Sequence, residues 1–318
     1  MATSSAPITG LQRDILACIG NTPLVPLRKI APASGARVLL KIESQNPTGS
    51  MKDRMALAMI EGAERDGKLK PGGAVVEYTG GSTGVSLSLV CAVKGYPLHI
   101  VSSDAFSKEK LDHMKILGAT LQLIPSDGGK MTEKLTRDMI EAARVVAEQT
   151  GAFWTDQFRN PHQAEGYRAM AEEIWQQTGG HVDAFVQMVG TAGSIRGTSE
   201  GLRRRSPRIR IVAVEPEESP VLSGGKPGGH KIDGVGAGFI PPLWQEGLAS
   251  QVERVSTDDA VAMALRLARE EGIFAGTSTG GNVIAALRVA EKLGPGATVV
   301  TVAVDSGTKY LKNFGARL

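Results

Sequence analysis

Cysteine is scarce in this sequence. The 318 residues include only Cys18 and Cys91, each in an apolar stretch. We therefore expect two buried free thiols in a reducing compartment, and neither a disulfide framework nor a redox pair is supported. Residues 1–14 also lack the apolar core segment of a secretory signal, which favours a cytoplasmic location.

Other protein classes are disfavoured by further absences. No apolar run approaches the ~20 residues that a membrane span needs. The five histidines show no metal-ligand spacing, so we expect no metal site. A net charge of +3 is too small to indicate a nucleic-acid partner. The one dense basic cluster, residues 203–205, is interpreted as the solvated end of a helix.

Glycine is abundant, with 39 residues, and many glycines directly follow apolar runs. The chain repeats a pattern of apolar strand, Gly-rich turn and helix, which predicts an α/β fold with mainly parallel sheets. Strands are predicted at residues 74–78, 98–101, 120–124, 184–189, 209–214 and 298–304, and helices at 85–94, 108–117 and 195–205.

Two separate groups of these units predict two α/β domains. We place a smaller domain at residues 45–150 and a larger one at residues 1–44 plus 151–318. Ligands of such folds bind at the carboxyl ends of the strands, so we expect the active site between the two domains.

Residues 46–54 (NPTGSMKDR) place a lysine at the start of a predicted helix. Ser50 suits the N-cap, which puts Lys52 in the first turn. There the helix field lowers the pKa of an amine and makes it a better nucleophile. A surface lysine beside Asp53 and Arg54 is the alternative, and the segment alone favours that alternative.

Residues 190–194 (GTAGS) follow a predicted strand and begin a helix. Exposed N–H groups and the positive helix end suit a phosphate there. A simple tight turn explains the segment equally well. A nicotinamide site is a further alternative, because Glu215 ends the next strand, although the glycine spacing is not G-x-G-x-x-G.

Three more segments have similar chemistry. Residues 79–84 (TGGSTG) offer hydroxyl and N–H groups at a helix start, which suits a carboxylate or a plain capped turn. Residues 276–281 (GTSTGG) and 305–310 (DSGTKY) are weak signals by themselves, because Ser/Gly turns are common.

Taken in order, these five segments resemble the cysteine synthase and cystathionine β-synthase family of fold-type-II pyridoxal 5'-phosphate (PLP) enzymes. Residues 19–25, 156–161 and 230–238 extend the resemblance over nearly the whole chain. It implies two three-layer α/β domains of the tryptophan synthase β type, with mainly parallel sheets and the active site between them.

The resemblance also implies residue roles. Lys52 matches the lysine that carries PLP as a Schiff base and then serves as general base. Ser278 matches the partner of the pyridine nitrogen, and Gly234 lies in a glycine segment facing the substrate. Matched to the cofactor phosphate are Gly190, Thr191, Ala192, Gly193 and Ser194. Matched to the substrate carboxylate, in a loop expected to close over it, are Thr79, Gly80, Gly81 and Thr83, together with Gln157.

The sequence departs from the family pattern within residues 79–84. The family usually has serine where Gly80 stands. It usually has asparagine, which contacts the ring hydroxyl of PLP, where Ser82 stands. Both departures lie at the reacting end of the site and bear on which substrate is used. Ala192 replaces a usual glycine, which is a smaller change.

The resemblance implies β-replacement, in which an activated serine such as O-acetylserine and a sulfur nucleophile give cysteine or a relative. The alternatives are β-elimination or dehydration, as in a cysteine desulfhydrase or a serine/threonine dehydratase, and a diaminopropionate-type synthase. A nicotinamide oxidoreductase and a non-catalytic protein of the same fold also stay open. We expect a homodimer acting on small molecules, and association with a serine acetyltransferase is not excluded.

Overall fold

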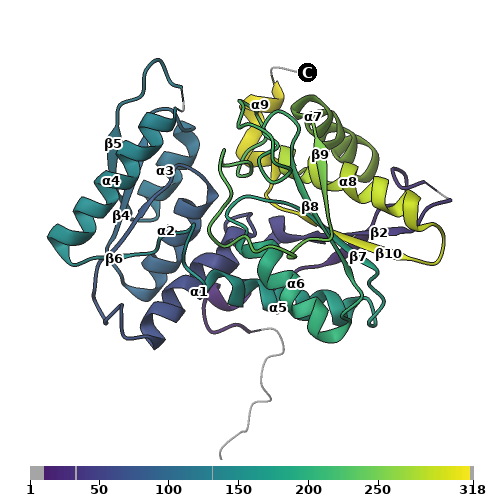
Figure 1. Cartoon of the computed structure of the whole chain (residues 1–318). Helices are drawn as coiled ribbons and strands as arrows, with labels where there is room; N and C mark the ends of the chain where they lie inside the picture. The colour runs from purple at the N-terminus through teal and green to yellow at the C-terminus, as the bar shows by residue number, and fades with distance from the viewer. Residues whose placement is uncertain (1–10, 33, 131, 316–318) are drawn as a thin grey trace, which may run out of the picture.

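The computed structural model of the protein describes residues 11–32, 34–130 and 132–315. Its strands form two sheets in separate lobes (Figure 1). Most of the N-terminal stretch expected to lack a secretory signal lies outside the described residues. The helices and strands come almost entirely from the pattern of apolar runs and glycine turns that the sequence shows.

The larger lobe contains a six-stranded sheet with the order β1-β2-β10-β7-β8-β9. All neighbouring strands are parallel except β1 and β2. The strands are β1 (Leu24–Pro26), β2 (Arg37–Ile42), β7 (Ala184–Met188), β8 (Arg210–Pro216), β9 (Gln251–Val255) and β10 (Thr298–Ala303).

The smaller lobe contains a fully parallel four-stranded sheet with the order β5-β4-β3-β6. Its strands are β3 (Val75–Tyr78), β4 (Leu98–Ser103), β5 (Thr120–Ile124) and β6 (Phe153–Trp154). Strand β6 lies beyond the domain boundary that we place at residue 150, and the domain limits themselves stay a prediction.

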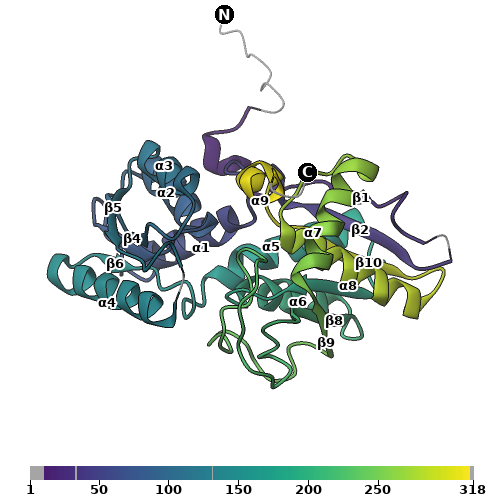
Figure 2. The same ribbon diagram turned by 90° about the horizontal axis from the view of Figure 1, so that it is seen from above.

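Helices cover both faces of each sheet (Figure 2). The helices are α1 (Lys52–Arg65), α2 (Ser82–Lys94), α3 (Lys108–Ile116), α4 (Glu133–Thr150), α5 (Gln163–Gln177), α6 (Gly193–Arg205), α7 (Thr257–Arg266), α8 (Thr277–Leu293) and α9 (Leu311–Gly315). Short 3-10 turns are η1 (Ile15–Cys18), η2 (Glu43–Gln45) and η4 (Gly307–Tyr310), and η3 (Leu267–Glu271) is a π-helical turn. In the described part of the chain, no helix combines the length and apolar character that crossing a membrane requires.

Successive side chains of the central strands point alternately into two different cores, which explains why the strand sequences are continuously apolar. In β7, Ala184 and Val186 pack in the core beneath α7 and α8, whereas Phe185 packs in the core shared with α5 and α6. Strand β8 alternates in the same way. The predicted two-domain α/β class with mainly parallel sheets is therefore confirmed.

Most predicted elements differ slightly in extent from those observed, as two examples show. The helix predicted at residues 195–205 begins earlier, at Gly193, because the glycine turn already forms the first helical turn. The strand predicted at residues 209–214 runs from Arg210 to Pro216. Both shifts lie at element ends, where the apolar pattern gives little information.

The prediction of two buried thiols is confirmed for Cys91 and wrong for Cys18. Cys91 is buried in α2, and burial raises its pKa to about 12. Cys18 is exposed, because it ends the short turn η1 on the surface. Its apolar neighbours suggested a core element that the chain does not form there.

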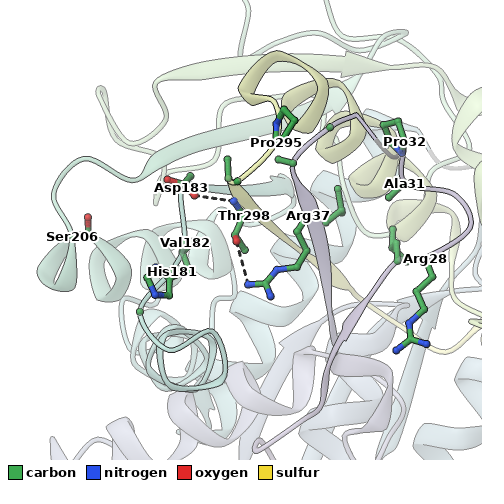
Figure 3. A pocket seen from close by; sticks show the side chains of 17 residues that line it. Arg28, Ala31, Pro32, Arg37, His181, Val182, Asp183, Ser206, Pro295 and Thr298 are labelled. Carbon is green, nitrogen blue, oxygen red and sulfur yellow. Dashed lines mark hydrogen bonds between the residues drawn. The ribbon is translucent and has the colours of Figure 1, made fainter.

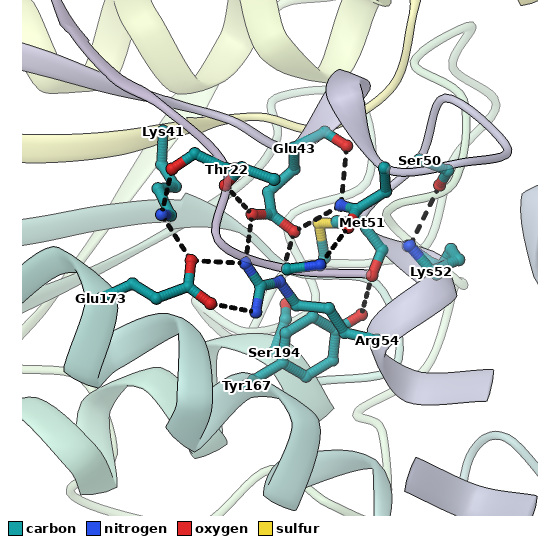
Figure 4. A network of polar contacts seen from close by, with 12 residues as sticks. Thr22, Lys41, Glu43, Ser50, Met51, Lys52, Arg54, Tyr167, Glu173 and Ser194 are labelled. Atoms are coloured by element: carbon teal, nitrogen blue, oxygen red, sulfur yellow. Dashed lines mark hydrogen bonds and ion pairs between the residues drawn. The ribbon is translucent and has the colours of Figure 1, made fainter. Parts of the chain in front are cut away.

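A buried ionic network anchors α1 to the larger sheet (Figure 4). The guanidinium of Arg54 donates from Nε to Glu43 Oε2 at 2.6 Å and from Nη2 to Glu173 Oε2 at 2.8 Å. The Nζ atom of Lys41 lies 2.6 Å from the same Glu173 oxygen. Burial alone would raise the pKa of Glu173, but Arg54 and Lys41 lower it to about 2. The start of α1, where Lys52 lies, is thereby fixed relative to β2 and α5.

Candidate active site

A cavity of about 840 Å³ lies at the carboxyl ends of β3 and β7 and is lined by residues from both lobes. Its size suits a small-molecule or cofactor site. Of the residues predicted from the sequence, it brings together Lys52, Thr79, Gly80, Gly81, Ser82, Thr83, Gln157, Gly190, Thr191, Ser194 and Gly234. Ala192, Gly193 and Ser278 were also predicted for the site but do not line the cavity.

Lys52 is the first residue of α1 and lines this cavity. The N-cap is Met51, so the N-cap prediction for Ser50 is wrong. Ser50 instead accepts a hydrogen bond from the backbone N–H of Lys52 at 3.1 Å and donates one to Asp305. The chain holds Ser50 in a β-bridge to Asp305, which keeps this residue outside the cap position.

The pKa of Lys52 is lowered, as predicted, but burial is the main cause. The charge of Asp305 opposes the shift, and the charge of Lys309 adds to it. A lowered pKa increases the fraction of neutral amine, which is the form that attacks a carbonyl group or accepts a proton.

The loop at residues 190–194 joins β7 to α6. Ala192 is the N-cap of α6 and adopts the left-handed conformation, with φ +68°. The first N–H groups of a helix have no partner within it, so this turn suits an anion. The hydroxyl of Thr191 donates to Gln163 at 2.7 Å, and Ser194 accepts from Gln187 at 2.7 Å.

The glycines of this loop are required by close packing. A Cβ at Gly190 would lie 2.4 Å from the carbonyl oxygen of Gly234. A Cβ at Gly193 would lie 2.0 Å from Gln163 Oε1. Gly193 and Ala192 therefore shape the loop without reaching the cavity themselves.

The opposite loop, residues 79–84, packs against apolar side chains of the smaller lobe. A Cβ at Gly80 would lie 1.9 Å from ring atoms of Phe106. A Cβ at Gly84 would lie 2.7 Å from Met114 Cε. The Phe106 ring thus takes the space that a serine side chain at position 80 would need, and Phe106 itself lines the cavity.

Thr83 and Gln157 are held as a pair at the end of β3. Thr83 Oγ1 donates to Gln157 Oε1 at 2.9 Å, and Gln157 Nε2 donates to the Tyr78 carbonyl at 3.1 Å. The backbone N–H of Gln157 donates to Glu77 at 3.0 Å. Burial raises the pKa of Glu77 to about 8. The side-chain amide of Gln157 is thus positioned by Thr83 and Tyr78, and its backbone by Glu77.

Ser82 lines the cavity, but its hydroxyl donates to Asp305 Oδ2 at 2.8 Å. The same oxygen accepts from the Tyr310 hydroxyl at 2.5 Å. Burial alone would raise the pKa of Asp305, yet the nearby ammonium groups of Lys309 and Lys52 lower it. Asp305 is therefore a charged carboxylate that links the first turn of α2 to the start of α1 and to η4.

Ser278 lies buried in the first turn of α8. Its neighbours connect that turn to the cavity wall: Thr277 Oγ1 accepts from the Asp233 N–H at 3.3 Å, and Thr279 Oγ1 accepts from the Val304 N–H at 3.0 Å. The weak segment at residues 276–281 thus supports two segments that do line the cavity.

Sequence reasoning missed several cavity residues. The aromatic residues Phe106, Phe158 and Phe239 line the cavity, and so do Lys110 and Lys309. Phe158 and Lys309 lie inside segments that the sequence did single out. The other three lie in regions without a motif, so only the folded chain brings them to the site.

A second hollow of about 740 Å³ lies at the amino ends of strands in the larger sheet, whereas the first cavity lies at carboxyl ends (Figure 3). It is lined by Arg37 and Thr298, at the amino ends of β2 and β10. Arg37 donates to Thr298 Oγ1 at 3.3 Å, and the Thr298 N–H donates to Asp183 at 2.8 Å. None of the residues predicted for the active site lines this hollow.

The described residues hold no cluster of His, Cys, Asp and Glu suited to a metal ion. The larger cavity does fit PLP. It joins the lowered-pKa amine of Lys52, suited to an aldehyde, to the helix-start loop at residues 190–194, suited to a phosphate.

Comparison with known proteins agrees with this fit. Residues 15–305 match the family described as pyridoxal-phosphate dependent enzyme, and the chain belongs to this family. It is therefore a PLP-dependent enzyme.

Individual relatives cover nearly the whole chain. A cysteine synthase of Staphylococcus aureus (strain Mu50 / ATCC 700699) is 44% identical over 300 residues, which are 94% of this chain and 95% of the relative. The crystal structure of O-acetylserine sulfhydrylase isoform 3 from Entamoeba histolytica is 36% identical, with a TM-score of 0.91, and covers 100% of this chain and 95% of that one. An O-ureido-L-serine synthase structure is 36% identical, with a TM-score of 0.89, and the match covers 96% of this chain and 95% of that one. The fold is that of the fold-type-II enzymes.

Proposed function

We propose that this protein catalyses β-replacement on an activated serine, such as O-acetylserine, with a sulfur nucleophile to give cysteine. One observation carries the proposal: the amine of Lys52 shares a single cavity with two helix-start loops suited to two different anions. The similarity to cysteine synthases and O-acetylserine sulfhydrylases supports the same reaction.

When bound, PLP supplies an electron sink that weakens bonds at Cα and permits loss of the group on Cβ. The chain would hold PLP through Lys52 and through the N–H and hydroxyl groups of residues 190–194. Ser278 stays the predicted partner of the pyridine nitrogen. Ser82 stays a predicted contact of the ring hydroxyl, although its own hydroxyl donates to Asp305.

Lys52 has the main chemical role. Burial lowers the pKa of its amine, which makes the neutral form that takes the proton from Cα more available. After replacement at Cβ, the same ammonium can return that proton to Cα. The anchoring of α1 through Arg54 keeps the amine in one place during both steps.

The substrate carboxylate is assigned to the loop at residues 79–84, with Thr79, Gly80, Gly81 and Thr83 predicted to contact it. Gln157 adds an amide held against Thr83. Backbone N–H groups at the start of α2 stabilise an anion without a charged side chain. Gly234 offers only backbone at the opposite wall, which leaves room for the substrate side chain.

The direct test is product analysis. PLP-loaded protein is incubated with O-acetylserine and sulfide, and the products are identified by mass spectrometry, with Lys52→Ala as the inactive control. We expect cysteine to form only when both reactants are present. Pyruvate and ammonia formed from O-acetylserine at the same rate with or without sulfide would contradict the proposal.

We further infer a cytoplasmic homodimer from the family resemblance. Light scattering coupled to size-exclusion chromatography tests the assembly: a mass of one chain would contradict it. Binding to a serine acetyltransferase stays a prediction.

A further inference from the structure

One ammonium group in the active-site cavity lacks a partner. Lys309 lies in η4 and lines the cavity, and its Nζ atom is buried with no hydrogen-bond partner among the described residues. Leaving a buried amine without a partner costs free energy, so such a group is usually matched to something that binds it.

The neighbours place this amine close to the reacting end of the site. A Cβ at Gly49, just before α1, would lie 3.6 Å from Lys309 Cε. The charge of Lys309 also lowers the pKa of Lys52, after burial as the main cause. Lys309 therefore lies beside the start of α1, in a part of the cavity that neither anion-suited loop provides.

The carboxylate of Asp305, whose charge acts on Lys309, does not form a hydrogen bond with its amine. Asp305 already accepts hydrogen bonds from Ser50, Ser82 and Tyr310. Burial, opposed by the charges of Asp305 and Asp53, lowers the pKa of Lys309, so a new anion would favour its charged form.

A second cation faces the same region from the smaller lobe. The Nζ atom of Lys110 lies 4.4 Å from the centroid of the Tyr310 ring and 3.9 Å from Asp233 Oδ1. Its side chain is only 12% exposed. Lys110 on α3 and Lys309 on η4 thus approach the cavity from opposite lobes.

We propose that Lys309, with Lys110, forms a subsite for a tetrahedral oxyanion carried on the Cβ side of the substrate. This inference rests on the proposed β-replacement. The oxyanion has two chemical sources, the phosphate leaving group of O-phosphoserine or the terminal oxygens of thiosulfate acting as nucleophile. In both, the tetrahedral phosphorus or sulfur atom that carries the oxygens lies two bonds from the reacting Cβ, and Lys309 offers three N–H donors to these oxygens.

The reaction balances in either case. The Cβ–O bond breaks and the leaving group keeps the electron pair, while the sulfur atom supplies the pair for the new Cβ–S bond. The Cα proton leaves and returns through Lys52. Neither case needs an oxidant or reductant.

Direct binding to the PLP-loaded enzyme is the first test, because PLP then occupies the phosphate loop. Calorimetric titration with sodium sulfate and sodium thiosulfate is compared for wild type, Lys309→Gln and Lys309→Met. We expect the neutral variants to bind both anions at least about tenfold more weakly, as loss of a charged hydrogen bond predicts. Lys309→Arg should stay within about threefold of wild type, because it retains the charge.

Lys312 provides a matched control. Lys312 borders the same cavity three positions further along the chain, but its side chain is exposed and its ammonium is already paired with Glu109. Lys312→Gln should bind sulfate and thiosulfate within about twofold of wild type, as expected for an exposed pair. Wild-type affinity in both neutral Lys309 variants would overturn the subsite, as would equal losses in Lys312→Gln.

Steady-state kinetics separates the two sources. For Lys309→Gln we expect kcat/KM to fall selectively for O-phosphoserine with sulfide if the subsite receives the leaving group. A selective fall for O-acetylserine with thiosulfate assigns it to the nucleophile. If both pairs keep wild-type values while O-acetylserine and sulfide still react, the subsite is wrong and the proposed function stands.

Failure of the proposed function would look different. In that case no pair of reactants gives a β-substituted product in wild-type enzyme, whereas calorimetry still reports whether Lys309 binds an oxyanion. The binding assay therefore tests Lys309 independently of turnover.

Discussion

The two loops that face each other across the cavity both need glycine, but different atoms fill the space around them. In the loop at residues 190–194, Gly190 and Gly193 pack against a backbone carbonyl and a side-chain amide. In the loop at residues 79–84, Gly80 and Gly84 pack against the side chains of Phe106 and Met114. The larger-lobe loop is thus confined by polar and backbone atoms, and the smaller-lobe loop by apolar side chains.

This difference suits the two roles that we propose. A cofactor that stays bound needs a rigid cradle, and backbone packed on backbone cannot yield. A substrate that enters and leaves needs a loop that can move. The apolar contacts with Phe106 and Met114 can slide, whereas Ser82 and Thr83 are tied to Asp305 and Gln157 by single hydrogen bonds. The ionic network around Arg54 adds to the rigidity on the larger-lobe side.

Replacing Lys52 should have the largest effect. We expect Lys52→Ala to lower kcat/KM by at least about 10³-fold, because it removes the general base. The loop at residues 190–194 should still bind PLP, more weakly, because its N–H groups are unchanged. Kinetics and equilibrium dialysis measure the two effects, with Lys68→Ala as an exposed control. Activity above a tenth of wild type would refute the role of Lys52.

Replacing Glu173 tests whether its ion pairs with Lys41 and Arg54 stabilise the larger-lobe side of the site. Its pKa is lowered to about 2, below its ordinary value of 4.5, so its stabilisation is present above pH 4.5 and is lost as the pH falls toward 2. Glu173→Gln should therefore lower the free energy of unfolding at pH 7 by about 2–3 kcal/mol. The difference from wild type should shrink steadily below pH 4.5.

Chemical denaturation at several pH values measures this effect. Glu172→Gln is the matched control, since Glu172 lies on the same helix and is exposed in a pair with Arg205. It should change stability little at any pH. If the loss in free energy of unfolding caused by Glu173→Gln stays constant between pH 7 and pH 3, the ionised carboxylate of Glu173 is not what stabilises the protein.

Side-chain substitution tests the apolar confinement of the smaller-lobe loop. Gly80→Ser should cost about 1–3 kcal/mol by overpacking against Phe106. In the Gly80→Ser/Phe106→Ala double variant, the loss should be smaller than the sum of the single losses by about 1 kcal/mol. Gly190→Ala is the contrast, because the Gly234 carbonyl that it meets cannot be truncated. If the stability losses of Gly80→Ser and Phe106→Ala are strictly additive, Phe106 does not confine the loop at position 80, and the proposed difference between the two loops is wrong.

Thiol labelling gives the smallest expected effect. Cys18 is exposed and should react with a thiol reagent in the native protein, whereas Cys91 is buried and should react only on unfolding. Labelling with Ellman's reagent before and after denaturation should release about one and then about two equivalents. Two equivalents in the native state would mean that α2, which follows the smaller-lobe loop, opens readily; Cys18→Ser identifies the reacting thiol.

The fold and the larger-lobe loop could be predicted because their signals are local. Continuous apolar runs predict β7 and β10 as buried strands, and a glycine turn directly after β7 predicts the helix-start loop. Lys52 was placed at the start of α1 from neighbouring residues alone. Each of these signals occupies fewer than a dozen consecutive positions, which is the range over which sequence patterns are informative.

The smaller-lobe side could not be predicted in the same way, because its partners are distant in the sequence. Ser82 donates to Asp305, 223 residues away. Gly80 is required by Phe106, which belongs to no motif. The exposure of Cys18 was also missed, since its apolar neighbours gave no sign that η1 lies on the surface. Such compensations become visible only when the chain is folded.

The central claim is that the amine of Lys52 carries PLP, and covalent mapping tests it most directly. PLP-loaded protein is reduced with borohydride and digested, and the labelled peptide is identified by mass spectrometry. The account predicts a stable PLP adduct on Lys52 alone. An adduct on Lys309, the other cavity lysine whose pKa burial lowers, or no adduct at all, would contradict it.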